Sequence, residues 1–144
     1  MITYEIIKEC LDILEIKYTD LTEEDGGIAV CFFDKETFSH EIYTNIHVVN
    51  DELVSFISYA DDYHPEGDLL AMANRHNYRS HCPRCYIDDD GDVIMHQAFV
   101  LAAEVSPNYI LKDVIHATIS LTMEAFSNFE LDMEEFSNRV SNKD

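Results

Sequence analysis

The chain has 144 residues, of which 47% are hydrophobic, and its eight phenylalanines and eight tyrosines suit one globular domain with an ordinary core. Nine basic residues against 29 acidic ones leave a formal net charge of −20. A charge of this size repels nucleic-acid phosphates and anionic lipid headgroups, so we expect no nucleic-acid partner and no membrane partner. An acidic surface instead suits basic or amphipathic protein partners.

The N-terminal segment predicts an amphipathic helix with Thr3 as its N-cap. Its apolar residues recur at spacings of three and four: Ile6, Ile7, Cys10, Leu11 and Leu14. Charged residues interrupt this stretch, so it lacks the continuous apolar segment of a signal peptide. The longest uncharged run, residues 93–103, is too short to span a bilayer as a helix. Four cysteines are too few for a disulfide framework in a chain of this length. We therefore expect a cytoplasmic protein with reduced cysteines.

Residues 28–60 predict three antiparallel strands. The stretch 28–34 is apolar on both faces, as in a central strand. Apolar residues alternate along 38–48, and Asn50-Asp51 turns the chain into a strand over 52–60.

A second helix and a hairpin follow. Pro65 suits the first helical turn, and Leu69, Leu70, Met72 and Ala73 supply the buried side of the helix. Asn77 suits a left-handed C-cap. Residues 84–88 and 93–103 then form a hairpin whose Asp90-Gly91 dipeptide is typical of a type I′ turn.

The third helix is capped by Ser106, starts at Pro107 and is apolar around nearly its whole circumference, with no charge between Asp113 and Glu124. Such a helix needs cover on two sides, from the sheet and from the first helix, the tail or a second subunit. We expect an α+β fold of order α-β-β-β-α-β-β-α, with a five-stranded antiparallel sheet packed against helices. A single domain over 1–129 precedes an acidic helical tail over 130–144, which keeps an apolar stripe of Phe129, Met133, Phe136 and Val140.

The densest group of chemically active residues lies between the second helix and the hairpin, and consists of His76, His81, Cys82 and Cys85. Two histidines and two cysteines can complete a tetrahedral zinc site. Zinc sites usually join two short ligand pairs from separated loops, whereas these four residues fall within ten positions. A redox Cys-x-x-Cys pair sits where a strand leads into a helix, because the helix dipole lowers the thiol pKa; here a helix leads into a strand.

The other candidate groups lack parts of the motifs they approach. Asp88, Asp90 and Gly91 fit a calcium loop, but Tyr86 and Gln97 occupy its first and last ligand positions, so a hairpin turn is favoured. His40 and His47, around Glu41, are seven residues apart and point to opposite sides of a strand. The group Asp61, Asp62 and His64 could bind a cation weakly, but it is explained more simply as the loop before the second helix and the complement of the dipole at its N-terminus. No nucleophile elbow or phosphate loop is present. We therefore assign no catalytic, cofactor-binding or metal-binding residue and expect a protein that is not an enzyme.

The order of elements, together with several short signals, resembles the bacterial YbjN-domain family, described as sensory-transduction regulators. These signals are Asn74-x-x-Asn77, Pro83-Arg84-x-Tyr86, the Asp-Gly turn and a final helix from Ser106 to Phe126. His76 departs from the pattern, which often carries a large aromatic there, and the two cysteines are not part of it. The resemblance implies a fold shared with type III secretion chaperones, a homodimer or a protein-binding surface, and no known catalysis.

Two functional hypotheses follow. The first is a non-enzymatic cytoplasmic protein-binding or regulatory module, similar to a chaperone or adaptor, that forms a homodimer and binds a protein or peptide. The alternative is a zinc-binding sensor or metal-dependent enzyme that uses His76, His81, Cys82 and Cys85.

Overall fold

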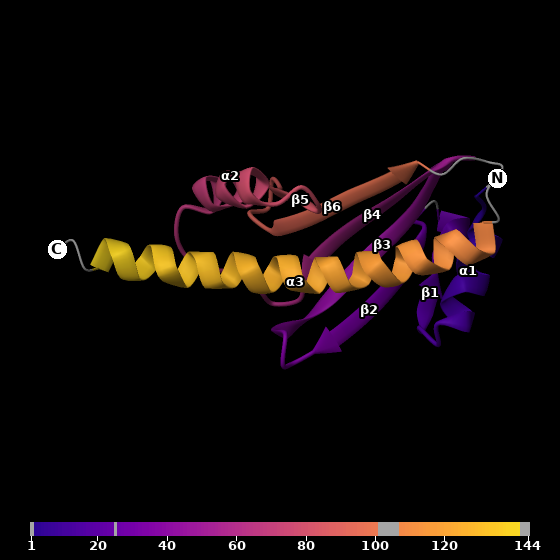
Figure 1. The fold of residues 1–144 in the computed structure, drawn as a ribbon, viewed down its shortest axis with the longest axis horizontal. Helices are drawn as coiled ribbons and strands as arrows, with labels where there is room; N and C mark the ends of the chain where they lie inside the picture. The colour runs from indigo at the N-terminus through magenta and orange to yellow at the C-terminus, as the bar shows by residue number, and fades with distance from the viewer. Residues whose placement is uncertain (1, 25, 101–106, 142–144) are drawn as a thin grey trace.

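The computed structural model describes residues 2–24, 26–100 and 107–141 and contains one antiparallel sheet with helices (Figure 1). The elements are α1 (Tyr4–Ile13), β1 (Tyr18–Asp20), a short 3-10 helix η1 (Thr22–Glu24), β2 (Ile28–Asp34), β3 (Phe38–Asn50), β4 (Leu53–Ala60), α2 (Leu69–Arg79), β5 (Arg84–Ile87), β6 (Val93–Val100) and α3 (Pro107–Ser141). The strand order is β1-β2-β3-β4-β6-β5. The α+β class is confirmed, but the sheet has six strands rather than the predicted five.

The additional strand, β1, lies in the segment after α1 that showed no strand pattern. Its residues pair with Ile28 to Val30 of β2, and Lys8 of α1 forms an ion pair with Asp20 at its end. Three residues are too few to show the alternation of apolar and polar positions on which a strand prediction depends. The strand forms because β2 offers it backbone partners.

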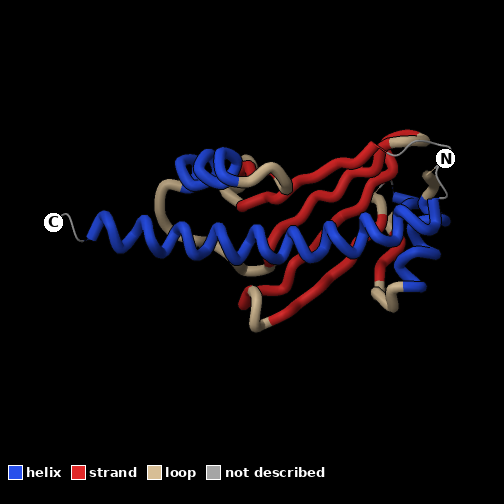
Figure 2. Tube along the Cα trace, in the orientation of Figure 1, coloured by secondary structure: helices blue, strands red, loops and turns tan. Residues whose placement is uncertain are grey.

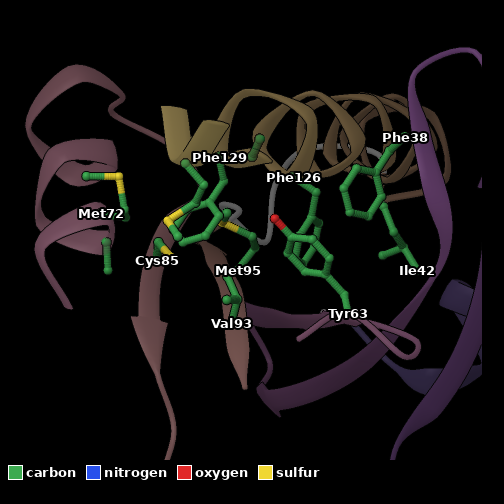
Figure 3. Close-up of a cluster of buried hydrophobic side chains, with 12 residues drawn as sticks. Phe38, Ile42, Tyr63, Met72, Cys85, Val93, Met95, Phe126 and Phe129 are labelled. Atoms are coloured by element: carbon green, nitrogen blue, oxygen red, sulfur yellow. The ribbon is translucent and has the colours of Figure 1, made fainter. Parts of the chain in front are cut away.

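The helices cover one face of the sheet and leave the other open. In Figure 2 the long α3 crosses the strands, while α1 and α2 lie near opposite ends of the sheet. The strand residues in both hydrophobic cores share one parity, including Ile42 and Ile46 of β3, Phe56 of β4 and Met95 of β6. One core joins β3, β5 and β6 to α2 and the second half of α3 (Figure 3), and the other joins the sheet to α1 and the first half of α3.

Along β3, β4, β6 and α3, buried polar residues separate the residues that belong to one core from those that belong to the other. Thr44 Oγ1 and Ser58 Oγ, on β3 and β4, are 2.6 Å apart. Gln97 on β6 donates through Nε2 to Thr122 Oγ1 of α3 at 3.0 Å, and the Thr122 hydroxyl donates to the Thr118 carbonyl at 2.7 Å. These bonds satisfy polar groups that would otherwise be costly to bury, and they tie α3 to one position on the sheet.

The predicted apolar circumference of α3 is wrong. Its buried stripe has helical periodicity and includes Leu111, Ile115, Phe126, Phe129 and Met133. The outward side is largely polar and exposed, with Asp113, His116, Ser120, Glu124 and Asn128, although Leu121 and Leu131 are also exposed. Uncharged Ser, Thr and His residues had given the segment its apolar appearance. The second cover predicted for this helix is supplied by α1, whose Ile7, Cys10 and Leu11 share a core with Leu111 and Ile115. The helix continues without interruption to Ser141; Met133 is buried and Phe136 packs against the core, while the Val140 side chain and Ser106 lie outside the description.

The predicted ends of α2 are also corrected. The helix begins at Leu69, where the Asp68 carboxylate accepts the Ala71 N–H at 3.1 Å, so Pro65 precedes the helix. Met72 and Ala73 are buried as predicted, whereas Leu70 is 67% exposed.

Asn77 lies inside α2 and is not its cap. Its side chain forms two hydrogen bonds with the backbone of Cys85: Nδ2 donates to the carbonyl oxygen at 2.8 Å, and Oδ1 accepts the N–H at 2.7 Å. β5 is an edge strand, and its outer backbone groups would otherwise lack partners. Asn77 therefore takes the place of a seventh strand at this position.

The hairpin between β5 and β6 is confirmed, but its turn is not type I′. The Gly91 N–H donates to the Asp88 carbonyl and the Asp88 N–H donates to the Asp92 carbonyl, both at 3.0 Å. Gly91 has a φ of 83°, whereas Asp90 is not left-handed. A type I′ turn needs positive φ at both central residues, so the loop is instead a type I turn followed by a left-handed glycine. Asp88 also accepts the N–H groups of Asp90 and Asp92, which stabilises this form.

Replacing Asn77 with alanine leaves the Cys85 N–H and carbonyl without side-chain partners. We expect Asn77→Ala to lower the free energy of unfolding by about 2–3 kcal/mol, measured by urea denaturation. Asn128→Ala, on the exposed side of α3, is the control and changes stability little. Equal losses in the two variants would show that the contact with Cys85 contributes nothing specific.

Candidate functional site

The four candidate zinc ligands do not form one site. In the described part of the chain, ligand atoms of three His, Cys, Asp or Glu residues come close together at Asp88, Asp90 and Asp92. This group contains none of the four candidate zinc ligands. His76 is buried and its Nε2 lies 2.9 Å from the Pro83 carbonyl, while His81 is exposed. The zinc alternative therefore has no geometric support.

The two cysteines of the Cys-x-x-Cys pair have different surroundings. Cys82 donates its thiol hydrogen to Gln97 Oε1, with 2.7 Å between sulfur and oxygen. Cys85 is 4% exposed and packs in the core that contains Met95 and Phe129 (Figure 3). Burial raises the pKa of both thiols, that of Cys85 to about 12. Both shifts favour the protonated thiol, which is a poor nucleophile.

The acidic turn brings three carboxylates together, and one of them binds the backbone of the turn. Ligand oxygens of Asp88, Asp90 and Asp92 lie within 4.8 Å of one another. Asp88 Oδ1 accepts the Asp90 N–H at 3.0 Å and the Asp92 N–H at 2.8 Å. The position of Asp88 is thus explained by the turn that it stabilises.

The remaining candidates are also dispersed. His40 faces the helices, where its Nδ1 lies 2.9 Å from the Asp61 carbonyl and its ring contacts Phe38 and Tyr63. His47 has the opposite parity on β3 and faces the open side of the sheet, as predicted. Asp62 and His64 are exposed in the loop before α2 and come no closer than an ion-pair contact of 3.8 Å.

The open face of the sheet was not predicted from the sequence, and it is formed by strand residues opposite in parity to the core. Strand pairing aligns one row across five strands, made of Cys31, Tyr43, Tyr59, Ile94 and Tyr86. A second row contains Ala29, Asn45, Ile57, His96 and Arg84. The sequence does show which strand positions are opposite in parity to the core. Only the strand order, however, places the positions of different strands in one row.

Aromatic contacts give this face a fixed shape. The Tyr43 and Tyr59 rings stack with centroids 5.5 Å apart, and Tyr86 meets His96 edge to face at 6.5 Å. Tyr59 and Tyr86 remain 46% and 43% exposed, because no helix of the described chain packs over them.

Charge is nearly absent from the open face. Among its described strand residues, the charged ones are Glu41 and Arg84, although the chain carries a net charge of −20. The Tyr43 hydroxyl donates to Glu41 Oε2 at 3.1 Å, and this bond raises the Tyr43 pKa to about 12. The surface is therefore aromatic, neutral and suited to contact with another polypeptide.

The comparison with protein families identifies the chain. The model of the YbjN family, described as "Putative bacterial sensory transduction regulator", matches residues 3–131. The chain belongs to the YbjN family. The match extends from the start of α1 into the second half of α3 and confirms the family indicated by the sequence signals. No curated protein and no solved structure gives a significant match. The fold link to type III secretion chaperones therefore stays a prediction for this YbjN chain.

Within the described residues of this YbjN chain, no helix combines the length and hydrophobicity needed to cross a bilayer.

Cysteine substitution tests whether the 76–85 segment holds zinc. Cys82→Ser keeps a donor for Gln97 and leaves the melting temperature almost unchanged, whereas Cys85→Ser places a hydroxyl in the core and costs about 1–3 kcal/mol. We expect neither added zinc nor EDTA to change the melting temperature of the wild-type protein or of either variant, measured by thermal denaturation. A zinc-dependent rise that both substitutions abolish would instead establish a metal site.

Proposed function

We propose that this YbjN-family chain is a non-enzymatic cytoplasmic regulatory module that acts by binding protein, and that its open sheet face joins two copies into a homodimer. The observation that carries the proposal is a broad, aromatic, nearly uncharged face on a strongly acidic chain. The description of the family as sensory transduction regulators supports the regulatory part.

The small number of charges on the open face limits the electrostatic cost of binding a second copy there. Two molecules that each carry a net charge of −20 repel one another, and contact through acidic surfaces brings carboxylates close together. Contact through the open face avoids most of this repulsion, because Glu41 and Arg84 are its charged strand residues in the described chain.

The side chains of the open face are of the kind that stabilises protein interfaces. Tyrosine buries a large ring while keeping its hydroxyl available for a hydrogen bond, and it is enriched at interfaces. Aromatic rows on sheets also stack nucleic-acid bases in some proteins. The net charge of −20 opposes that alternative, since phosphate binding needs basic residues and this face offers Arg84.

The rest of the surface fits an adaptor that binds a basic partner. Exposed carboxylates lie along α3, on the helical side of the sheet, and Asp61 and Asp62 of the loop before α2 lie beside Tyr59 at the margin of the open face. They steer a basic polypeptide toward the protein, and the effect weakens as salt increases. A chaperone-like role also needs a neutral surface and a charged one. The non-enzymatic part of the proposal is supported by the Cys82 and Cys85 thiols, whose raised pKa values favour the protonated form and leave no activated nucleophile there.

A charge placed on the open face tests the homodimer. Tyr59→Glu puts an extra carboxylate at a 46% exposed position, and we expect it to convert the dimer to a folded monomer of 16.6 kDa. The measurement is light scattering during gel filtration. Leu131→Glu, at a 59% exposed position on α3, adds the same charge away from the sheet and keeps the dimer.

Two results would contradict this assignment. A monomeric wild-type protein would exclude the homodimer, and a dimer retained in Tyr59→Glu would place the interface elsewhere.

A further inference from the structure

The two charged strand residues of the open face lie far apart on it, along a diagonal. Glu41 is on β3 and Arg84 is on the edge strand β5, in the strand order β3-β4-β6-β5. Three spacings of about 4.8 Å separate these strands by about 14 Å across the sheet. Strand pairing places Arg84 level with Asn45, so Arg84 is also displaced by four positions, or about 14 Å, from Glu41 along the strands. The line between Glu41 and Arg84 therefore runs at roughly 45° to the strands.

These two charges are not neutralised by each other or by another charge of the described chain. No ion pair among the described residues involves Glu41 or Arg84. The Tyr43 hydroxyl donates to Glu41 Oε2 at 3.1 Å, which holds this carboxylate on the face, and Arg84 is exposed. Asp61 adds an exposed carboxylate beside Glu41, since its N–H donates to the Glu41 carbonyl at 2.8 Å. The face is negative near Glu41 and positive near Arg84, so a second copy that is turned round can complement it.

The open face also has the area that a dimer needs. It extends across five strands and, along β3, from Glu41 to Val49. Strand spacing and rise per residue make it roughly 19 by 27 Å. Two such faces in contact bury about 1,000 Å², which is the lower limit for a specific interface. A small peptide would leave much of this face uncovered, whereas a second copy covers it.

We propose that two copies stack through their open faces so that Glu41 of each copy forms an ion pair with Arg84 of the other. In a twofold dimer every contact occurs twice, so one acid and one base on the face form two ion pairs. The inference rests on the proposed homodimer and deepens it by stating which residues meet. Glu41 and Arg84 are positioning residues in this interface, because they set how one face lies on the other.

The pairing fixes the arrangement of the two sheets. A twofold axis that exchanges Glu41 and Arg84 must bisect the line between them at right angles. The midpoint of that line lies between Tyr59 of β4 and Ile94 of β6, which are paired in the sheet. Tyr59 therefore lies beside the axis, next to the same residue of the second copy. Because the axis is diagonal to the strands, the strands of the two copies cross at about 90°, which is one of the two ways in which sheets stack.

Charge reversal tests the ion pair. In the dimer of Glu41→Arg two bases face each other, and in the dimer of Arg84→Glu two acids do. We expect each variant to dimerise at least about tenfold more weakly than the wild type, measured by sedimentation velocity over a dilution series. The double variant with both reversals restores an acid opposite a base and regains the wild-type affinity.

Mixing the two single variants provides the sharper readout. In a mixed dimer both contacts again join an acid and a base, so we expect mixed dimers to exceed both homodimers in a one-to-one mixture. Native mass spectrometry distinguishes the three species, because the substitutions move the mass of the 16.6 kDa chain in opposite directions. Formation of mixed dimers also shows that both variants are folded.

Net charge provides a control with the opposite sign. A change from glutamate to arginine raises the net charge by two, from −20 to −18, so reduced general repulsion alone would make Glu41→Arg dimerise more tightly. Glu124→Arg makes the same change at an exposed position of α3, and we expect it to keep or strengthen the dimer.

The outcomes separate the ion pair from the homodimer itself. A wild-type dimer for which Glu41→Arg behaves as Glu124→Arg does, or for which mixed dimers are not preferred, would overturn the ion pair and leave the homodimer in place. A monomeric wild-type protein would overturn both.

Discussion

The packing of α3 across one face of the sheet is the contact on which the rest of this structure depends. At 35 residues, the helix is about 50 Å long, so it reaches both hydrophobic cores and continues beyond them. Leu111 and Ile115 complete the core with α1, and Phe126 and Phe129 complete the core with α2. The Gln97–Thr122 hydrogen bond holds the helix in register between these cores. Because a single helix spans both cores, the two ends of the sheet are held in one unit.

This arrangement leaves one face of the sheet available for contact. The sheet face opposite α3 has no helical cover in the described chain, and its row of Tyr43, Tyr59 and Tyr86 is aromatic and neutral. The charged residues among its described strand positions, Glu41 and Arg84, are opposite in sign and lie apart on a diagonal. A nearly neutral face with one acid and one base suits association with a like-charged copy. Such a surface is consistent with a family of regulators and does not require catalysis.

The segment with the most chemically active side chains turns out to serve the fold. Asn77 closes the outer edge of β5, His76 lies against the Pro83 carbonyl, and Cys85 fills a core position. Closely spaced polar residues are ambiguous in a sequence, because spacing along the chain does not state the direction of each side chain. Here a helix end and an edge strand take these residues in different directions, so no common ligand position exists among them.

Local sequence patterns determined the class, the order of the main elements and the family of this protein. Periods of two and of about 3.6 residues are properties of neighbouring positions, so β2, β3, β4, β6 and the three helices could be predicted, and the Asp-Gly turn added β5. Tertiary structure decided what depends on distant residues: the short strand β1, the role of Asn77, the single buried stripe of α3 and the open sheet face. The tyrosine row requires five strands in register, and the diagonal between Glu41 and Arg84 requires the order of those strands. Neither the register of five strands nor their order in the sheet is encoded in the spacing of nearby residues.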